Sequence, residues 1–156
     1  MDDIFFMSQA IKRAKKAASL GEVPIGAVIV KDNKIVSSGY NLREKKNNSL
    51  LHAEIIAIDR ACKKLGVWRL EDCTLYVTLE PCPMCAGAII NSRIKRVVFG
   101  GYDKKAGVFG SVFNIADYAF NHKYEVTGGI LEEECAGLLS DFFMQLRINK
   151  KGVRLL

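Results

Sequence analysis

The chain has 156 residues, of which 49% are hydrophobic and 26% are charged, so it is long enough for a single domain over 1–156 with a buried core. No segment approaches the uncharged apolar length that spans a bilayer, and the acidic start Met1-Asp2-Asp3 argues against a secretory or organellar leader. We therefore expect a cytoplasmic protein without a membrane partner.

The first predicted elements are a helix and a hairpin. Apolar residues recur at helical spacing over 4–18, with lysines on the opposite side, which predicts an amphipathic helix. Two apolar runs follow at 25–31 and 34–40, on either side of Asp32-Asn33. A pair of turn residues between two such runs predicts a β-hairpin.

A polar loop at 41–51 separates the hairpin from a second helix, which we expect to end near Gly66. Its apolar face is predicted to comprise Ile55, Ile58, Cys62 and Leu65.

The second half of the chain alternates strands and helices. We predict strands at 73–79, 95–100 and 124–127, and helices at 83–91 and 131–147. A hairpin followed by this alternation predicts an α/β fold, in which a mixed five-stranded sheet lies between helices in three α/β/α layers.

Basic residues give a formal net charge of +6, and they are clustered. Such clusters predict a polyanionic partner, although solvated helix faces would also explain them. The clusters are Lys12, Arg13, Lys15 and Lys16; Arg43, Lys45 and Lys46; Lys104 and Lys105; and Arg147, Lys150, Lys151 and Arg154.

The most informative motif combines His52 with Cys82 and Cys85. Pro83 favours a helix start, which places Cys82 at the cap and Cys85 one turn further on, on the same side. The partial positive charge of a helix N-terminus favours thiolates there. His52 begins another helix, so we infer that two helix N-termini converge on one metal ion. One imidazole and two thiolates suit Zn²⁺ and leave its fourth tetrahedral position open.

Glu54 lies two residues after the histidine, where its carboxylate could move protons at a water in that open position. Water bound to zinc reaches a pKa of about 7. The expected reaction is the attack of hydroxide on an aromatic carbon that carries an amino group, with release of ammonia.

Other interpretations of the cysteine motif are disfavoured. A closed structural zinc site needs four protein ligands, but His122 is the only other histidine and there is no second Cys-x-x-Cys pair. A thioredoxin-like redox motif would need a neighbouring βαβ context. The five cysteines are an odd number, so Cys62, Cys73 and Cys135 are expected to be reduced core residues.

The pairing of His-x-Glu with Pro-Cys-x-x-Cys is the signature of zinc-dependent deaminases. Beyond it, the chain resembles bacterial tRNA-specific adenosine deaminases of the TadA type over nearly its whole length. The stretches that carry the resemblance include Val23-Pro24-Ile25-Gly26-Ala27-Val28, Gly39-Tyr40-Asn41, Thr74-Leu75-Tyr76-Val77-Thr78-Leu79-Glu80-Pro81-Cys82, Met84-Cys85-Ala86-Gly87-Ala88, Arg96-Val97-Val98-Phe99-Gly100 and Leu138-Leu139-Ser140-Asp141-Phe142-Phe143.

This resemblance implies a cytidine deaminase-like fold, one catalytic Zn²⁺ per subunit and a homodimer. It also implies conversion of adenosine to inosine at the wobble position of a tRNA anticodon, in bacteria that of an arginine tRNA. By motif position, the metal ligands are His52, Cys82 and Cys85, and Glu54 is the proton shuttle.

The resemblance further suggests which residues bind the substrate. Asn41 is expected to contact the flipped base, Ile25 to pack near it, and Ala53 to offer a backbone hydrogen bond. Further RNA contacts are expected at Asp103, Lys105, Asn121, Phe143 and Arg147. Many relatives carry Asp-Pro-Thr-Ala where this chain has 48–51 as Asn-Ser-Leu-Leu, which predicts a different loop rim beside the substrate.

Two alternatives remain open. One is a small-molecule deaminase of the same fold that acts on cytosine or guanine. The other is a non-catalytic RNA-binding or zinc-scaffold module, which would not need Glu54. The basic C-terminal helix favours an RNA partner over a free base, and no DNA partner is expected.

Overall fold

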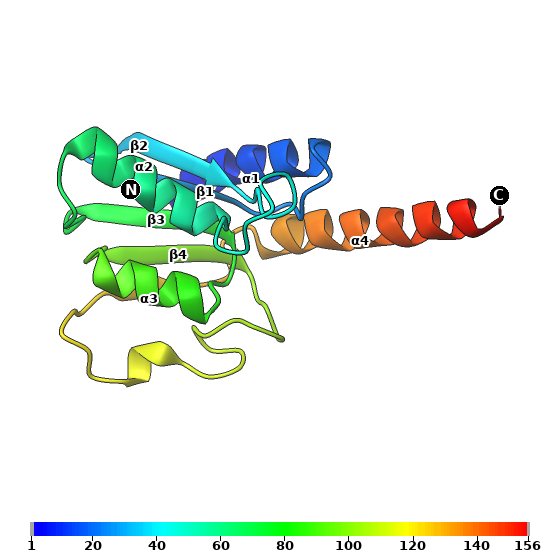
Figure 1. Ribbon diagram of the computed structural model, residues 1–156. Coiled ribbons are helices and arrows are strands. Elements are labelled where there is room, and N and C mark those ends of the chain that lie inside the picture. Colours follow the sequence, from blue (N-terminus) through cyan, green and yellow to red (C-terminus); the bar gives the residue numbers. More distant parts are fainter. Residues whose placement is uncertain (1, 156) are drawn as a thin grey trace.

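The computed structural model describes residues 2–155, and it describes side chains as far as residue 150. Five strands form one sheet in the order β2-β1-β3-β4-β5 (Figure 1). The strands are β1 (Gly26–Lys31), β2 (Lys34–Tyr40), β3 (Cys73–Leu79), β4 (Arg96–Gly101) and β5 (Glu125–Thr127). The helices are α1 (Asp3–Ser19), α2 (Ala53–Leu65), α3 (Pro83–Asn91), α4 (Glu132–Leu155) and the short 3₁₀ helix η1 (Ile115–Asp117).

The sheet is mixed, as the sequence predicted. Strand β1 pairs antiparallel with both β2 and β3, whereas β3–β4 and β4–β5 are parallel pairs. The β1–β2 hairpin turns at Asp32 and Asn33, whose φ angles are +50° and +62°. Two successive positive φ angles characterise the tight turn that matches the twist of paired strands, and Asp and Asn tolerate this conformation well.

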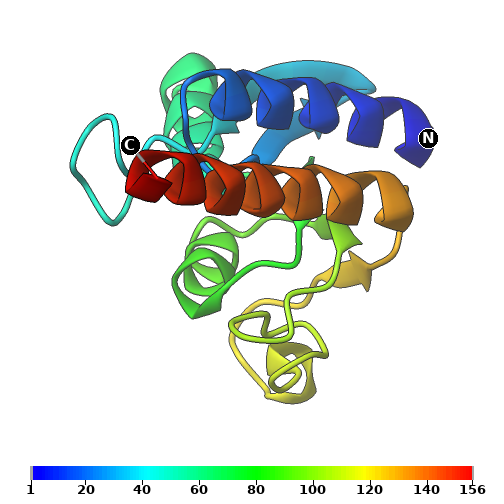
Figure 2. The same ribbon diagram turned by 90° about the vertical axis from the view of Figure 1, so that its right-hand side faces the viewer.

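Helices cover both faces of the sheet, which confirms the three-layer α/β/α prediction. Helices α2 and α3 pack on one face, while α1 and α4 lie side by side on the other (Figures 1 and 2). Strand β1 shows how the sequence supports both layers. Ala27 and Ile29 are buried under α2, and Val28 and Val30 are buried under α1. Neighbouring strand residues point to opposite faces, so a continuous apolar run suits a strand covered on both sides.

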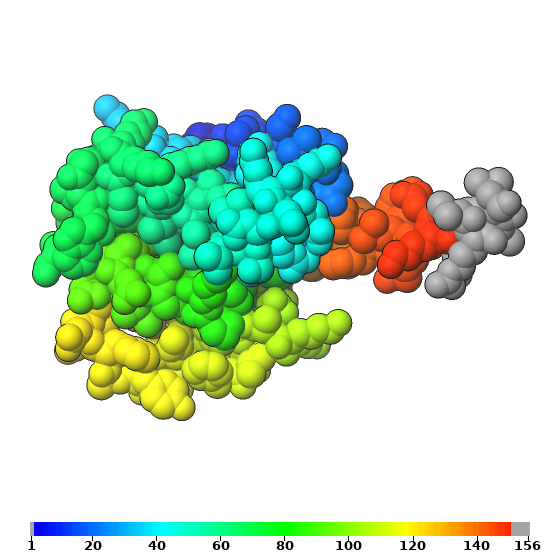
Figure 3. Space-filling model, viewed as in Figure 1, coloured from blue at the N-terminus to red at the C-terminus, as the bar shows by residue number. Residues whose placement is uncertain are grey.

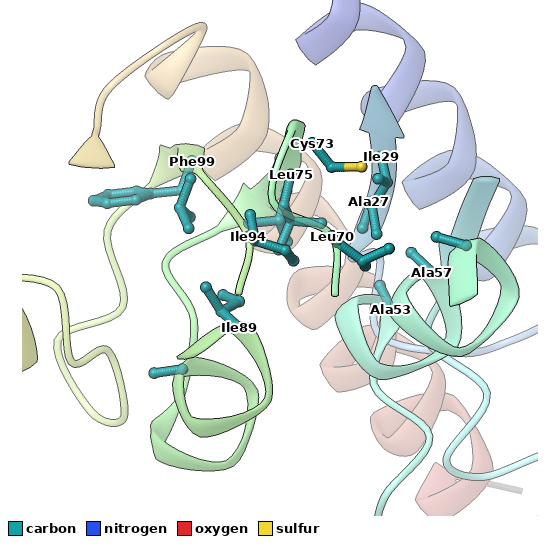
Figure 4. Close-up of a cluster of buried hydrophobic side chains, with 14 of the residues drawn as sticks. Ala27, Ile29, Ala53, Ala57, Leu70, Cys73, Leu75, Ile89, Ile94 and Phe99 are labelled. Atoms are coloured by element: carbon teal, nitrogen blue, oxygen red, sulfur yellow. The ribbon is translucent and has the colours of Figure 1, made fainter. Parts of the chain in front are cut away.

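The core beneath α2 and α3 is built partly from small side chains (Figure 4). Ala53, Ala57 and Ala61 of α2 are fully buried, whereas Ile55 is only partly buried, so the apolar face predicted for this helix was partly wrong. The reason is the close approach of α2 to β2, where any Cβ on Gly39 would overlap the backbone of Ala53. Such close approach suits alanine better than a larger apolar residue.

Helix α4 is longer than the sequence analysis predicted, since it continues to Leu155 instead of ending at residue 147. Its first turns pack on the sheet through Cys135, which lies against Gly100 of β4. Its later turns project beyond the body of the molecule (Figures 1 and 3). All five cysteines are free thiols; Cys73 and Cys135 are buried.

In the described part of the chain, no helix combines the length and the apolar character that crossing a bilayer would require.

Candidate metal and catalytic site

The three predicted metal ligands meet at two helix N-termini. His52 is the N-cap residue of α2, and Cys82 is the N-cap residue of α3, where Pro83 occupies the first helical position. The carbonyls of His52 and Cys82 accept the first helical hydrogen bonds, from Ile56 and Ala86. Neither cap side chain forms a capping hydrogen bond to its own helix, so both remain available as ligands.

The geometry of these donors fits Zn²⁺. The Nδ1 atom of His52 lies 3.7 Å from Sγ of Cys82 and 3.6 Å from Sγ of Cys85. Ordinary zinc–sulfur and zinc–nitrogen bond lengths place N and S about 3.6 Å apart around a tetrahedral ion. Among the described residues, no fourth His, Cys, Asp or Glu donor joins this group, so the group offers three donor atoms to a metal ion. One imidazole and two sulfurs are a usual donor set for this ion, and three protein ligands leave one coordination position for water or substrate.

The charges within the group also suit a metal. A hydrogen bond from the Cys85 thiol and the nearby imidazole of His52 lower the pKa of Cys82 to about 4. The same interaction with Cys82, together with burial, raises the pKa of Cys85. One thiolate is therefore already favoured in the absence of an ion, and a bound cation must displace the remaining proton. Metal affinity is consequently expected to rise with pH.

Glu54 stands in the first turn of α2 and is only 4% exposed. Burial raises the pKa of its carboxyl to about 7. It lines the same cavity as His52 and Cys82. A carboxyl whose pKa is near neutrality can both accept and donate a proton at neutral pH, which suits a general acid–base catalyst.

The cavity above the metal ligands has a volume of about 610 Å³. Four of the predicted substrate-binding residues line it: Ile25, Asp103, Lys105 and Phe143. It opens between the loop at 41–51, the loop after β4 and the α4 helix, so segments distant in the sequence form one pocket.

The other four predicted substrate-binding residues are not part of the cavity lining, although Asn41 and Ala53 adjoin residues that are. Asn41 is buried at the end of β2, where its N–H donates to the carbonyl of Ile25 and its Oδ1 accepts from the N–H of Arg43. Ala53 is fully buried at the start of α2. Asn121 and Arg147 are exposed and do not line the cavity.

Some residues that line the cavity were not predicted from the sequence to be site residues. Arg43 and Lys104 were predicted only as members of basic clusters. The clustering of basic residues was the one sequence pattern that could indicate their position at the rim of the cavity. Tyr102 gave no signal, because nothing local distinguishes an aromatic residue after a strand. Glu80 also lines the cavity, where its buried carboxylate accepts hydrogen bonds from several backbone N–H groups.

The fold and the open three-donor site are those of a metal-dependent deaminase, and comparisons with known proteins agree. A family model described as MafB19-like deaminase matches residues 1–147. The chain is 56% identical over 153 residues to a tRNA-specific adenosine deaminase of Bacillus subtilis (strain 168), covering 97% of this chain and 95% of that one. It is 51% identical over 147 residues to the enzyme of that name from Haemophilus influenzae (strain ATCC 51907 / DSM 11121 / KW20 / Rd), covering 93% of this chain and 85% of the relative.

Solved structures give the same picture. A structure from a study of A-to-I editing by tRNA:A34 deaminases at the wobble position superposes with a TM-score of 0.82 at 41% identity, covering 86% of this chain and 99% of that one. A guanine deaminase from Bacillus subtilis superposes less well, with a TM-score of 0.63 at 43% identity, and covers 65% of this chain and 66% of that chain. The chain belongs to the MafB19-like deaminase family and, within it, to the tRNA-specific adenosine deaminases. The predicted family and the cytidine deaminase-like fold are both confirmed.

Proposed function

We propose that this protein hydrolytically deaminates the wobble adenosine of a tRNA anticodon, in particular that of an arginine tRNA, to inosine, with one Zn²⁺ held by His52, Cys82 and Cys85. The observation that carries the proposal is a buried Glu54 beside an open three-donor metal site in a pocket rimmed by basic residues. The family of the chain supports the same substrate.

Zn²⁺, when bound, would make a water molecule nucleophilic near neutral pH. Glu54 accepts the proton that this water gives up as its oxygen adds to C6 of the adenine ring. It then supplies this proton to the ring nitrogen N1, and it carries the second proton of the same water, from the oxygen now on C6, to the amino group. The C6–N6 bond breaks, ammonia leaves, and the oxygen remains as the carbonyl of inosine. Burial of Glu54 suits it both to accept a proton from water and to donate a proton to the substrate, because a pKa of about 7 makes the two steps comparably favourable at neutral pH.

The pocket has room for a single extruded nucleoside, and ligand cavities of 300 to about 1,000 Å³ are usual. Bases in an anticodon loop are already partly unstacked, so extruding one costs less than in a duplex. In this proposal Asn41, Ile25 and Ala53 surround the extruded base. The flanking nucleotides and phosphates are contacted by Asp103, Lys105, Asn121, Phe143 and Arg147.

A homodimer is part of the proposal. Several large apolar side chains are exposed on the segment between β4 and β5, which supports burial against another chain. They are Val112, Phe113, Tyr118 and Phe120. Because tRNA is the substrate, the cytoplasm is the expected compartment. Sedimentation equilibrium should give twice the 17.3 kDa subunit mass, and a subunit mass at micromolar concentration would remove the dimer from the proposal.

The direct test of function is inosine formation in a synthetic anticodon stem-loop with adenosine at the wobble position. The zinc-loaded protein should convert this adenosine, and a chelator should abolish the conversion. Free adenine, cytosine and guanine serve as competing substrates in parallel reactions. Deamination of guanine or cytosine without any reaction on the stem-loop would favour the small-molecule alternative and reject the proposal.

A further inference from the structure

Two buried glutamates beside the pocket have no role in the chemistry described above. Glu22, at the start of the segment after α1, is fully buried, and Glu80, directly after β3, is 2% exposed. Within residues 2–150, neither carboxylate forms an ion pair. A buried carboxylate without hydrogen-bond partners would be costly, so the groups that satisfy these two side chains are informative.

Glu80 is satisfied by the loop that follows β4. One of its oxygens accepts from the N–H of Asp103 at 3.1 Å and from the hydroxyl of Ser111. The other accepts from the N–H groups of Phe109 at 2.9 Å and Ser111 at 3.1 Å. The loop passes so close to the carboxyl that a Cβ on Gly107 would overlap it. The stretch that these hydrogen bonds enclose includes two lysines that line the pocket, Lys104 and Lys105.

Glu22 is satisfied in the same way by a different loop. Its two oxygens accept from the N–H groups of Glu44 at 3.0 Å and Lys45 at 2.6 Å. These residues directly follow Arg43, which lines the pocket. Each glutamate therefore fixes the backbone of one loop that presents basic side chains to the pocket.

We propose that Glu22 and Glu80 are positioning residues for the RNA substrate: each buried carboxylate holds one basic loop in the conformation that meets the phosphates beside the extruded adenosine. Glu22 acts through Arg43, and Glu80 acts through Lys104 and Lys105. The inference rests on the proposed function.

The chemistry explains why a carboxylate is needed. Both oxygens of each side chain accept N–H groups, and a carboxylate is the side chain that offers acceptors at both positions. Glutamine has the same shape but would turn an NH₂ group toward at least one backbone N–H. Two donors would then face each other, and the loop would move to separate them. RNA binding should weaken, while the metal ligands and Glu54, which are on α2 and α3, should keep their places.

The test compares Glu80→Gln and Glu22→Gln with wild type on the anticodon stem-loop. We expect KM to rise about five- to fifty-fold in each variant, as the loss of one or two buried hydrogen bonds would produce, and kcat to change less than about twofold. Zinc content should stay at one per chain. The slope of log Kd against log salt should fall by about one for each phosphate that the variant no longer neutralises. Glu71→Gln, which changes an exposed glutamate paired with Arg69, is the matched control and should behave as wild type.

Combined variants separate positioning from a general loss of structure. If Glu80 acts through the lysines, adding Glu80→Gln to Lys104→Ala/Lys105→Ala should raise KM less than about twofold further. Glu22→Gln should behave in the same way on an Arg43→Ala background. The inference would be overturned if the effects of the combined substitutions on KM multiplied. It would also be overturned if Glu80→Gln or Glu22→Gln lowered kcat with unchanged KM, or left the salt dependence of Kd unchanged.

A milder variant covers the case in which Glu80→Gln does not fold. Ser111→Ala keeps the carboxylate and removes one of its hydrogen bonds, so KM should rise about two- to fivefold with kcat unchanged. A wild-type KM for Ser111→Ala would contradict the role of Glu80. A wild-type enzyme that does not deaminate the stem-loop would instead reject the proposed function, and the inference with it.

Discussion

At the scale of single residues, the catalytic proposal depends on Glu54. Glu54→Gln keeps the size of the side chain but removes its ability to accept a proton. We expect kcat on the stem-loop to fall by about 10²- to 10⁴-fold, the usual contribution of a positioned general acid–base group, with zinc content unchanged. Asp59→Asn, an exposed change on the same helix, is the control. If Glu54→Gln turned over at the wild-type rate, Glu54 would not be the proton shuttle.

The raised pKa of Glu54 also predicts how stability depends on pH. Its pKa is about 7 in the folded protein and near 4.5 when unperturbed, because burial disfavours the charged form. The folded state therefore binds this proton more tightly than the unfolded state does. As a result, the free energy of unfolding falls as pH rises from 4.5 through 7. Zinc-free wild type should lose up to about 3 kcal/mol relative to Glu54→Gln between about pH 4 and pH 8. Urea denaturation of the two zinc-free proteins measures this difference, and parallel stability curves would contradict the shift.

At the scale of elements, α1 is tied to the sheet by a partly buried ion pair. Asp3 accepts two hydrogen bonds of 2.8 Å from Arg96 of β4 and one of 2.8 Å from the hydroxyl of Tyr76 of β3. The Arg96 guanidinium, as the largest cause, lowers the pKa of Asp3. A lowered pKa gives stability that is present above the ordinary value of 3.8 and is lost as pH falls through the folded value.

Asp3→Asn should therefore reduce the free energy of unfolding by about 1–3 kcal/mol near neutral pH, because it leaves Arg96 without its charged partner. The difference from wild type should shrink as pH falls below 3.8, where wild-type Asp3 also becomes protonated. Denaturant titrations near neutral pH and well below 3.8 measure both values. A loss of the same size at the two pH values would show that the ion pair is not the source of the stability.

The elements also show how far the sequence could be interpreted. The bounds of β3 and α3 were predicted correctly, because Pro83 marks the helix start and the apolar run of β3 is uninterrupted. The buried face of α2 was not predicted correctly, because it depends on how closely Gly39 of β2 lets α2 approach the sheet. The group of His52, Cys82 and Cys85 could be predicted from spacing, whereas the proposed roles of Glu22 and Glu80 depend on partners 22 to 31 residues away in the chain. Local patterns carry no information about such long-range hydrogen bonds.

At the scale of the whole molecule, charge and shape act together. The pocket lies between two loops that carry Arg43, Lys104 and Lys105, and α4 forms another wall through Leu139 and Phe143 before it projects beyond the body (Figure 3). Affinity for the stem-loop should fall steeply with salt, because each neutralised phosphate releases bound counterions. Fluorescence anisotropy between about 50 and 200 mM salt should show roughly a tenfold loss of affinity if two or three phosphates are neutralised. A flat dependence would exclude the basic rim as the binding surface.

The central claim is that three protein ligands hold the metal and leave its fourth position open beside Glu54. A crystal structure of the zinc-loaded protein, with the ion located by anomalous scattering at the zinc edge, tests this most directly. We expect one ion about 2.0–2.1 Å from Nδ1 of His52 and about 2.3 Å from each sulfur of Cys82 and Cys85, with a water in the fourth position within hydrogen-bonding distance of Glu54. An ion enclosed by four protein donors, or a Glu54 carboxyl directed away from it, would contradict the account.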